Sequence, residues 1–280
     1  MATTGVTALA DSVFAEIVEA EMVKELRPAM TSREFIRFAR KGPSTVASFP
    51  LWGDPGAAAA PANDLSEITS TALSDTEVSA TAAEVGFRVD VSDLVREVHP
   101  SDLYAEVAQM VARSVAEKWE TDLAALVDDF SNVTTAASTL TPTDLLAAVS
   151  ALEQRDIPGP YVGYLDPKQS GELRADIATT VSSYAIGKDE GLVRPFGDSG
   201  FFGTYMGLPI WQTSLVVTTS GLVGGAVFAS KAALGCYEIW GPRVETQRDA
   251  SFRALEFVGT QCYGFKEISD TRGQSLDSAA

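Results

Sequence analysis

Residues 161–174 read YVGYLDPKQSGELR, and this stretch carries the clearest structural signal in the chain. Its first five residues are aromatic, branched or small, and they follow a Pro-Gly-Pro turn at 158–160, which predicts a short buried strand over 161–165. Asp166 and Pro167 come next, and proline is well tolerated in the first turn of a helix. The stretch therefore predicts a strand that passes directly into a helix.

The segments on either side add more strands and another helix. Strand-like runs occur at 208–211, 226–229, 244–248 and 254–265. The residues Thr-Pro-Thr-Asp at 141–144 predict the start of a helix that continues over 145–154. The mixture predicts an α+β fold.

The longest helical pattern runs from Ser101 to Phe130. Apolar residues recur there at helical spacing, and neither glycine nor proline interrupts them. At 1.5 Å per residue such a helix is about 45 Å long, which exceeds the usual globular helix. Alanines at 105, 108, 112 and 116 allow a neighbouring element to approach closely.

A long excursion precedes this helix. Residues 43–66 are rich in proline, glycine and alanine, which predicts a loop, and from Glu77 to Val91 apolar and polar residues alternate as in a half-buried strand. A compact enzyme rarely contains such a long irregular segment. We therefore predict a projecting arm or hairpin. The residues before it, 8–41, predict helices interrupted at Pro28.

Charge is unevenly distributed in a chain whose formal net charge is −17. This balance argues against a protein that grips nucleic acid, because phosphates require a basic surface. Residues 21–41 are nevertheless locally basic, whereas residues 42–90 are acidic. The two stretches could pair within one subunit or between subunits, or each could simply face solvent.

No catalytic, cofactor-binding or metal-binding residues are predicted. His99 is the only histidine, and Cys236 and Cys262 are not arranged as a redox or zinc motif. The phosphate-binding and dinucleotide-binding glycine patterns are missing. The chain contains no apolar run long enough for a membrane helix and its start does not resemble a secretory signal, so we expect folding in a cytoplasm and no membrane partner.

The order of these segments resembles the major capsid proteins of tailed bacteriophages with the HK97-type fold. The resemblance rests on AEVGFRVDVSDL at 83–94, the long helix 101–130, the strand-DPKQ-helix block at 161–174, the GLPI strand at 207–210 and the closing strand 254–265. It implies a structural protein and no enzyme. Copies of the chain are expected to form hexamers and pentamers of an icosahedral shell, which encloses double-stranded DNA without sequence-specific binding.

The resemblance also implies a domain map. Residues 1–41 correspond to an N-terminal arm, 42–92 to an extended β-hairpin loop, 93–139 to the peripheral domain with its spine helix, 140–235 to the axial domain, and 236–280 to strands that return to the peripheral domain, of which the last could rejoin the axial domain. Eight residues are expected at subunit interfaces: Arg33, Arg37, Arg40, Lys41, Trp52, Glu77, Glu84 and Asp90.

Two departures from relatives are informative. Some relatives crosslink a loop lysine to a neighbouring asparagine, but residues 42–117 contain no lysine, so we expect no such crosslink from the loop. Some relatives also carry a long scaffolding segment before the arm, for which this chain has no room before residue 43. Either this sequence is the processed form or a separate scaffolding protein exists. A shell without crosslinks would rely on charge contacts between the arm and the loop or on an added cement protein, and the resemblance also implies a portal as a partner.

The expected location is the virion, after assembly in the cytoplasm of the host bacterium. Two other readings remain open at this stage. An encapsulin-like compartment would use the same fold to enclose a cargo protein. A soluble α+β enzyme that uses carboxylates would form a small oligomer instead.

Overall fold

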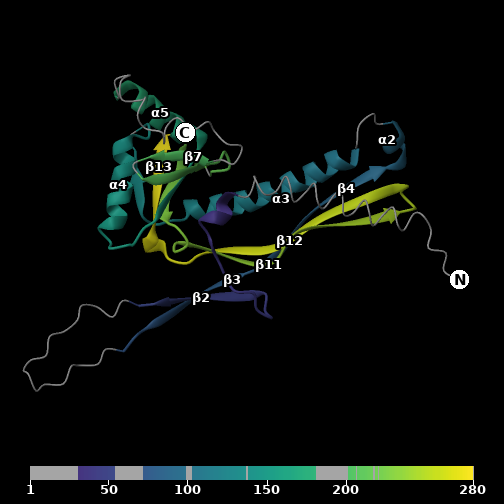
Figure 1. Ribbon diagram of the computed structural model, residues 1–280, viewed down its shortest axis with the longest axis horizontal. Coiled ribbons are helices and arrows are strands. Elements are labelled where there is room, and N and C mark those ends of the chain that lie inside the picture. Colours follow the sequence, from purple (N-terminus) through teal and green to yellow (C-terminus); the bar gives the residue numbers. More distant parts are fainter. Residues whose placement is uncertain are drawn as a thin grey trace, which may run out of the picture.

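The computed structural model of the chain describes residues 31–53, 72–98, 103–136, 138–180, 201–205, 207–216, 218–219 and 221–279. These residues form three sheets and four α-helices (Figure 1). The predictions for residues 8–30, for the loop 54–66 and for His99 lie outside the described residues.

The larger sheet has seven strands and contains the strand predicted over residues 161–165. The strand β6 (Tyr161–Leu165) lies between β8 (Leu208–Gln212), to which it is parallel, and the antiparallel β10 (Leu222–Ala229). The predicted strands over 161–165, 208–211 and 226–229 are thus confirmed. The sheet also contains β5 (Val133–Thr135), β7 (Phe201–Tyr205), β9 (Thr218–Thr219) and β13 (Gly273–Ala279). The helices α4 (Pro142–Glu153) and α5 (Pro167–Thr180) belong to the same part of the molecule (Figure 1).

Gln169 explains why the DPKQ block has its particular form. The side chain is fully buried, and its Nε2 donates to the carbonyl oxygens of Val223 at 3.0 Å and Leu276 at 2.9 Å. Its Oε1 accepts from the backbone N–H of Asp166 at 3.3 Å. Gln169 thereby fixes the start of α5 onto the strands β10 and β13, because buried polar groups are stable only when hydrogen-bonded.

The second sheet has four strands in the order β1 (Arg37–Phe38), β11 (Leu234–Asp249), β12 (Ala254–Glu267) and β4 (Ala83–Ser92). The helix α3 (Leu103–Asp128) packs along β4 and β12 and also reaches β10 of the larger sheet. Its core-facing side chains Val111, Trp119 and Leu123 are fully buried. The predicted long helix is confirmed, and it joins the two sheets (Figure 1). The short helix α2 (Asp93–Val98) follows β4.

The third sheet is a hairpin of β2 (Val46–Trp52) and β3 (Asp75–Thr81), which projects from the body (Figure 1). The prediction of one continuous strand over 77–91 was wrong, because β3 and β4 are separate strands divided at Ala82. The backbone N–H of Ala82 donates to the carbonyl of Thr45 at 2.8 Å, in register with the β2–β3 pairs, whereas from Ala83 onward the chain pairs with β12. Gly264 lies against this break, where a Cβ atom would overlap the carbonyl oxygen of Thr81.

Two other findings differ from the sequence-based expectations. Residues at the end of the expected arm are part of the core: Phe35 and Ile36 are buried, and the Phe35 ring packs edge-on against Tyr164 and Phe228. The 3-10 helix Thr31–Glu34 precedes them. The strand β13 was not predicted, and it lies in the seven-stranded sheet, beyond the 3-10 helix Asp270–Arg272. The range 236–280 therefore contributes to both larger sheets, through β13 rather than through the strand predicted at 254–265.

Candidate assembly surfaces

Arg33, which was expected at a subunit interface, has partners within the chain. Its guanidinium forms an ion pair with Glu238 on β11. The same guanidinium lies 5.2 Å from the ring centre of Phe38 and 5.1 Å from that of Trp119. Cation–π contacts of this kind stabilise an arginine that is partly removed from water. Arg33 thus helps to hold the segment 31–38 against α3.

The next three basic residues form a different surface, which we call the basic segment: Arg37, Arg40 and Lys41. All three are exposed, and no carboxylate among the described residues forms an ion pair with any of them. The Arg37 guanidinium lies 5.8 Å from the ring centre of Phe49 on β2. The basic segment is held at the base of the hairpin because the N–H of Ala39 donates to the carbonyl of Cys236 at 2.8 Å.

The hairpin is anchored at its base and exposed beyond it. Phe49 is buried in a small core with Ala80, Tyr237 and Ile268. The absence of a side chain at Gly235 allows this packing, since a Cβ atom there would lie 2.7 Å from the Phe49 ring. At the other end of β2, Trp52 is 71% exposed. Trp52 and Glu77 were both expected at a subunit interface. Both side chains are exposed in the single subunit.

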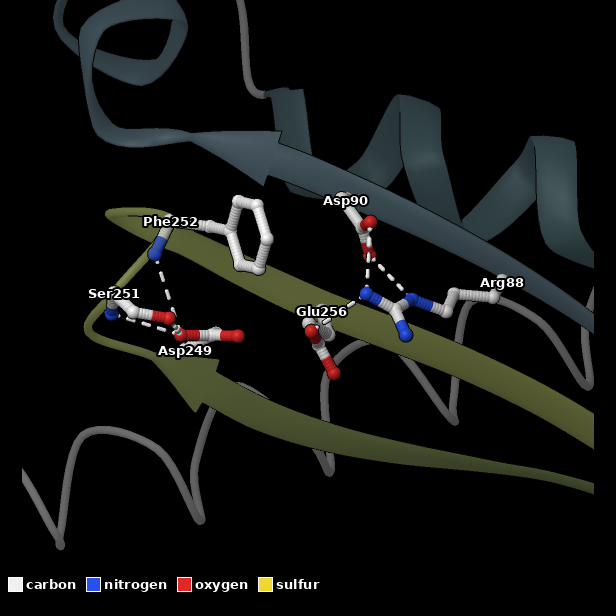
Figure 2. Close-up of polar contacts among 6 residues, drawn as sticks. All are labelled: Arg88, Asp90, Asp249, Ser251, Phe252 and Glu256. Carbon is white, nitrogen blue, oxygen red and sulfur yellow. Dashed lines mark hydrogen bonds and ion pairs between the residues drawn. The ribbon is translucent and has the colours of Figure 1, made fainter.

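The two remaining expected residues lie on β4. Glu84 is exposed. Asp90 forms an ion pair with Arg88, whose Nε donates to Asp90 Oδ1 at 2.7 Å and whose Nη2 donates to Glu256 Oε1 at 2.7 Å (Figure 2). Hydrogen bonding to Arg88 lowers the pKa of Asp90, and the same bond raises the pKa of Arg88. The charge of Asp90 is thus offset within the subunit.

Close to this cluster, the turn between β11 and β12 presents an aromatic side chain that the sequence analysis missed. Asp249 Oδ1 accepts from the backbone N–H groups of Ser251 at 2.8 Å and Phe252 at 3.3 Å (Figure 2). The Ser251 hydroxyl donates to the same oxygen, and this bond is the main cause of the lowered pKa of Asp249. Phe252 itself is 77% exposed. A phenylalanine in the short turn between two predicted strands was the signal available in the sequence.

A cluster of buried polar side chains at the centre of the molecule links three elements through hydrogen bonds. Glu120 on α3 accepts hydrogen bonds from the Ser32 hydroxyl at 2.6 Å and from the Tyr164 hydroxyl at 3.0 Å. Trp119 Nε1 donates to the Ser32 hydroxyl oxygen at 2.9 Å. Burial raises the pKa of Glu120. The cluster ties the segment 31–38, α3 and β6 together.

Cys236 shows no sign of a reactive thiol, because burial raises its pKa to about 12. Among the described residues, no three histidine, cysteine or carboxylate side chains gather as metal ligands. In the same part of the chain, no helix is both long and apolar enough to cross a membrane.

A long helix beside a four-stranded sheet, a second sheet with its own helices and a projecting hairpin together form the HK97-type fold. The family model described as phage capsid protein matches residues 75–273 of the 280. The chain therefore belongs to the phage capsid protein family. A comparison with curated protein sequences found no match.

Solved structures agree with the fold. A structure from Mycobacterium phage Che8 matches with a TM-score of 0.66 at 18% identity, over 83% of this chain and 84% of the other. The capsid of Ralstonia phage GP4 matches with a TM-score of 0.71 at 12% identity, over 88% and 87%. An encapsulin complex from Synechococcus elongatus PCC 7942 matches with a TM-score of 0.62 at 12% identity, over 89% and 87%.

Family and fold together establish the role. The chain is a structural component of the virion, a major capsid protein of the tailed-phage type that associates with copies of itself to build a shell. The reading as a carboxylate enzyme is set aside by the same family match.

Proposed function

We propose that the chain assembles as hexamers and pentamers into an icosahedral shell around double-stranded DNA, in the cytoplasm of the host bacterium. The observation that carries this proposal is the family match over residues 75–273. The net charge of −17 supports it further, because an acidic wall does not trap the packaged DNA. A separate scaffolding protein, a portal and a cement protein would complete the particle.

The domain map is part of the proposal. Residues 1–41 would act as the arm, 42–92 as the extended loop, 93–139 and most of 236–280 as the peripheral domain, and 140–235 as the axial domain around the capsomer axes. The seven-stranded sheet supports adding β5 and β13 to the axial part, because both strands pair within it.

Contacts between neighbouring subunits would join the basic segment to the hairpin. Arg37, Arg40 and Lys41 of one subunit are exposed cations, and Asp75 and Glu77 on β3 are exposed carboxylates on a projecting element. Opposite charges on two such surfaces favour a defined orientation. Trp52 would supply an apolar anchor beside them, and Glu84 a further carboxylate. We assign Arg33 and Asp90 to contacts inside the subunit, because Glu238 and Arg88 already pair with them.

The absence of lysine from residues 42–117 supports a shell held by non-covalent contacts in this loop. Denaturing gels of mature particles test this point. A single band at the monomer mass is expected, and a ladder of covalent multimers would contradict it.

Expression of the chain alone, followed by electron microscopy of the high-mass fraction, tests assembly itself. Shells, tubes or hexameric rings are expected. A protein compartment is the second candidate, since the encapsulin from Synechococcus elongatus shares the fold. Particles purified from the native source distinguish the two: double-stranded DNA inside supports the phage capsid, and a cargo protein inside supports the compartment.

A further inference from the structure

The helix that joins the two larger sheets carries a buried carboxyl group that has no cation beside it. Glu120 on α3 is only 7% exposed. Among the described residues, no lysine or arginine forms an ion pair with it. Burial of an ionised carboxylate is costly unless a group of opposite charge compensates for the lost water. The charge of Glu120 is therefore unfavourable in the folded chain, whereas its neutral acid is not.

Hydrogen bonds from two other elements meet at Glu120. From the segment 31–38, the Ser32 hydroxyl donates to Glu120 Oε1 at 2.6 Å, and from β6 the Tyr164 hydroxyl donates to Glu120 Oε2 at 3.0 Å. Trp119, the neighbour of Glu120 on α3, donates from Nε1 to the Ser32 oxygen at 2.9 Å. The side chain of Thr213, just beyond β8, forms a hydrogen bond with Tyr164. One carboxyl group thus connects the segment 31–38 and β6 to α3.

The other titratable groups in this part of the core do not compensate the charge of Glu120. Two of them contact the Trp119 ring, and each has a partner of its own: Arg33 pairs with Glu238, and the Tyr263 hydroxyl donates to Asp122 at 2.9 Å. The Cys236 thiol of β11 stays neutral, because burial raises its pKa to about 12. Burial, and then the charge of Glu120, raise the pKa of Tyr164, so that Tyr164 keeps its proton. The charge of the cluster is therefore the charge of Glu120.

We propose that Glu120 is a proton-sensitive latch, which fastens the segment 31–38 and β6 to α3 more firmly when its carboxyl group is protonated than when it is ionised. The protonated acid both donates and accepts, and the hydroxyl oxygens of Ser32 and Tyr164 lie within hydrogen-bond distance of it. The ionised acid accepts only, and neutral donors alone have to replace its water.

The latch is a property of the single subunit, so it does not depend on what the shell encloses. On the proposed domain map, the three elements that it connects belong to the arm, the axial domain and the peripheral domain. The proton on Glu120 would then control how firmly these three parts are joined.

The variant Glu120→Gln tests the latch in the full chain, because glutamine has the same shape and both donates and accepts at every pH. Burial raises the pKa of Glu120 above its ordinary value of 4.5, so above pH 4.5 the folded chain keeps a proton that the unfolded chain has lost. The unfolding equilibrium constant of the wild type, divided by that of Glu120→Gln, should therefore rise about tenfold per pH unit until the pH passes the folded-state pKa. Glu117→Gln, exposed on the same helix, should behave as the wild type does. A ratio that stays constant from pH 4.5 to neutral pH would overturn the proposal.

Hydrogen exchange locates the effect in the assembled or unassembled chain. Amides of the segment 31–38 and of β6 should exchange faster in the wild type than in Glu120→Gln, and the ratio of the two rates should grow as the pH rises. The ratio is taken at each pH, so the intrinsic pH dependence of exchange cancels. A difference confined to other elements would refute the assignment of the latch.

A second variant, Tyr164→Phe, keeps the proposal testable if Glu120→Gln does not fold. It removes one donor from the carboxylate, which raises the pKa of Glu120 further, so the loss of stability should extend to higher pH than in the wild type. Tyr161→Phe is the matched control, since Tyr161 lies on the same strand but its hydroxyl donates to the carbonyl of Ile157. Identical pH profiles for Tyr164→Phe and the wild type would contradict the latch.

Discussion

The basic segment with its hairpin and a second exposed surface, the apolar tip, manage charge in opposite ways. The apolar tip comprises exposed side chains of the β11–β12 turn and of α2: Phe252, Leu94, Val95 and Val98. Arg37, Arg40 and Lys41 have no ion-pair partner among the described residues, and the hairpin nearby exposes carboxylates. At the apolar tip, Arg88 and Arg248 are paired with carboxylates of the same subunit. Unpaired charge is available to a neighbour, and offset charge is not. One surface therefore suits an ionic contact and the other an apolar contact.

Charge reversal in the basic segment should have the largest effect on assembly. The triple variant Arg37→Glu/Arg40→Glu/Lys41→Glu should fold but form no shells, because like charges would then meet the neighbouring hairpin. Electron microscopy and sedimentation of the high-mass fraction measure the effect. Arg37→Lys/Arg40→Lys, which keeps the charge, is the control and should assemble. Intact shells from the triple variant would eliminate the ionic contact. Arg33 is left unchanged, since its ion pair with Glu238 contributes to folding.

Gly264→Ala should disturb the hairpin and leave the apolar tip intact. A Cβ atom at this position overlaps the carbonyl of Thr81, at the break between β3 and β4. Forcing an atom into a packed site usually costs about 1–3 kcal/mol, and the free energy of unfolding measured in urea should fall by that amount. Gly171→Ala on α5, where the space is open, is the control and should not destabilise the chain. An unchanged free energy of unfolding in Gly264→Ala would show that the hairpin is not held at this point.

The salt concentration should distinguish the ionic contact from the apolar contact. Raising the salt from about 0.1 M to about 1 M shortens the Debye length from about 10 Å to about 3 Å, which screens exposed charges and leaves apolar contacts. The ratio of the critical concentration for assembly of Arg40→Ala to that of the wild type should therefore approach one at high salt. The same ratio for Phe252→Ser should not decrease. Parallel behaviour of the two ratios would remove the distinction between the surfaces.

The smallest expected effect concerns the turn that presents Phe252. Hydrogen bonds from Ser251 lower the pKa of Asp249 below its ordinary value of 3.8. A carboxylate with a lowered folded-state pKa stabilises the structure above its unfolded pKa, and this contribution is lost as the pH falls through the folded value. Asp249→Ala should modestly raise the critical concentration near neutral pH and make it less sensitive to acid. Asp129→Ala, exposed at the other end of α3, serves as the control. Equal acid sensitivity of Asp249→Ala and the wild type would contradict this role.

The parts of the fold that local patterns specify were predictable. The helix 103–128 was expected because apolar residues recur over its whole length without a breaker, and β6 with the start of α5 follows from a strand bounded by Pro-Gly-Pro and Asp-Pro. The break at Ala82 had a signal in the sequence that the prediction missed, because the apolar positions are even-numbered at Val78, Ala80 and Ala82 but odd-numbered from Val85 onward. The change of pairing partner from β2 to β12 was not predictable, because β12 is distant in sequence.

The strand β13 was missed because its sequence, GQSLDSA, carries mostly polar residues into the core. Those residues are buried with partners from elsewhere: the Ser275 hydroxyl donates to the carbonyl of Gly225 at 3.3 Å, and Ser278 accepts from Gln169 at 3.2 Å. Tertiary contacts also determine which side chains are exposed or paired at the surface. In the sequence Arg33 does not differ from its basic neighbours, and only the structure shows its ion pair with Glu238. Leu94 and Val98 likewise resemble core residues of a helix, but α2 lies at an exposed end of the molecule.

The most direct measurement is a side-chain-resolution electron cryomicroscopy reconstruction of the particles that the chain forms. The expected result is a closed shell in which the basic segment of one subunit meets the hairpin carboxylates of its neighbour, and in which a neighbouring subunit covers Phe252. A small closed oligomer that leaves both the basic segment and Phe252 in solvent would contradict the assignment of these surfaces to assembly.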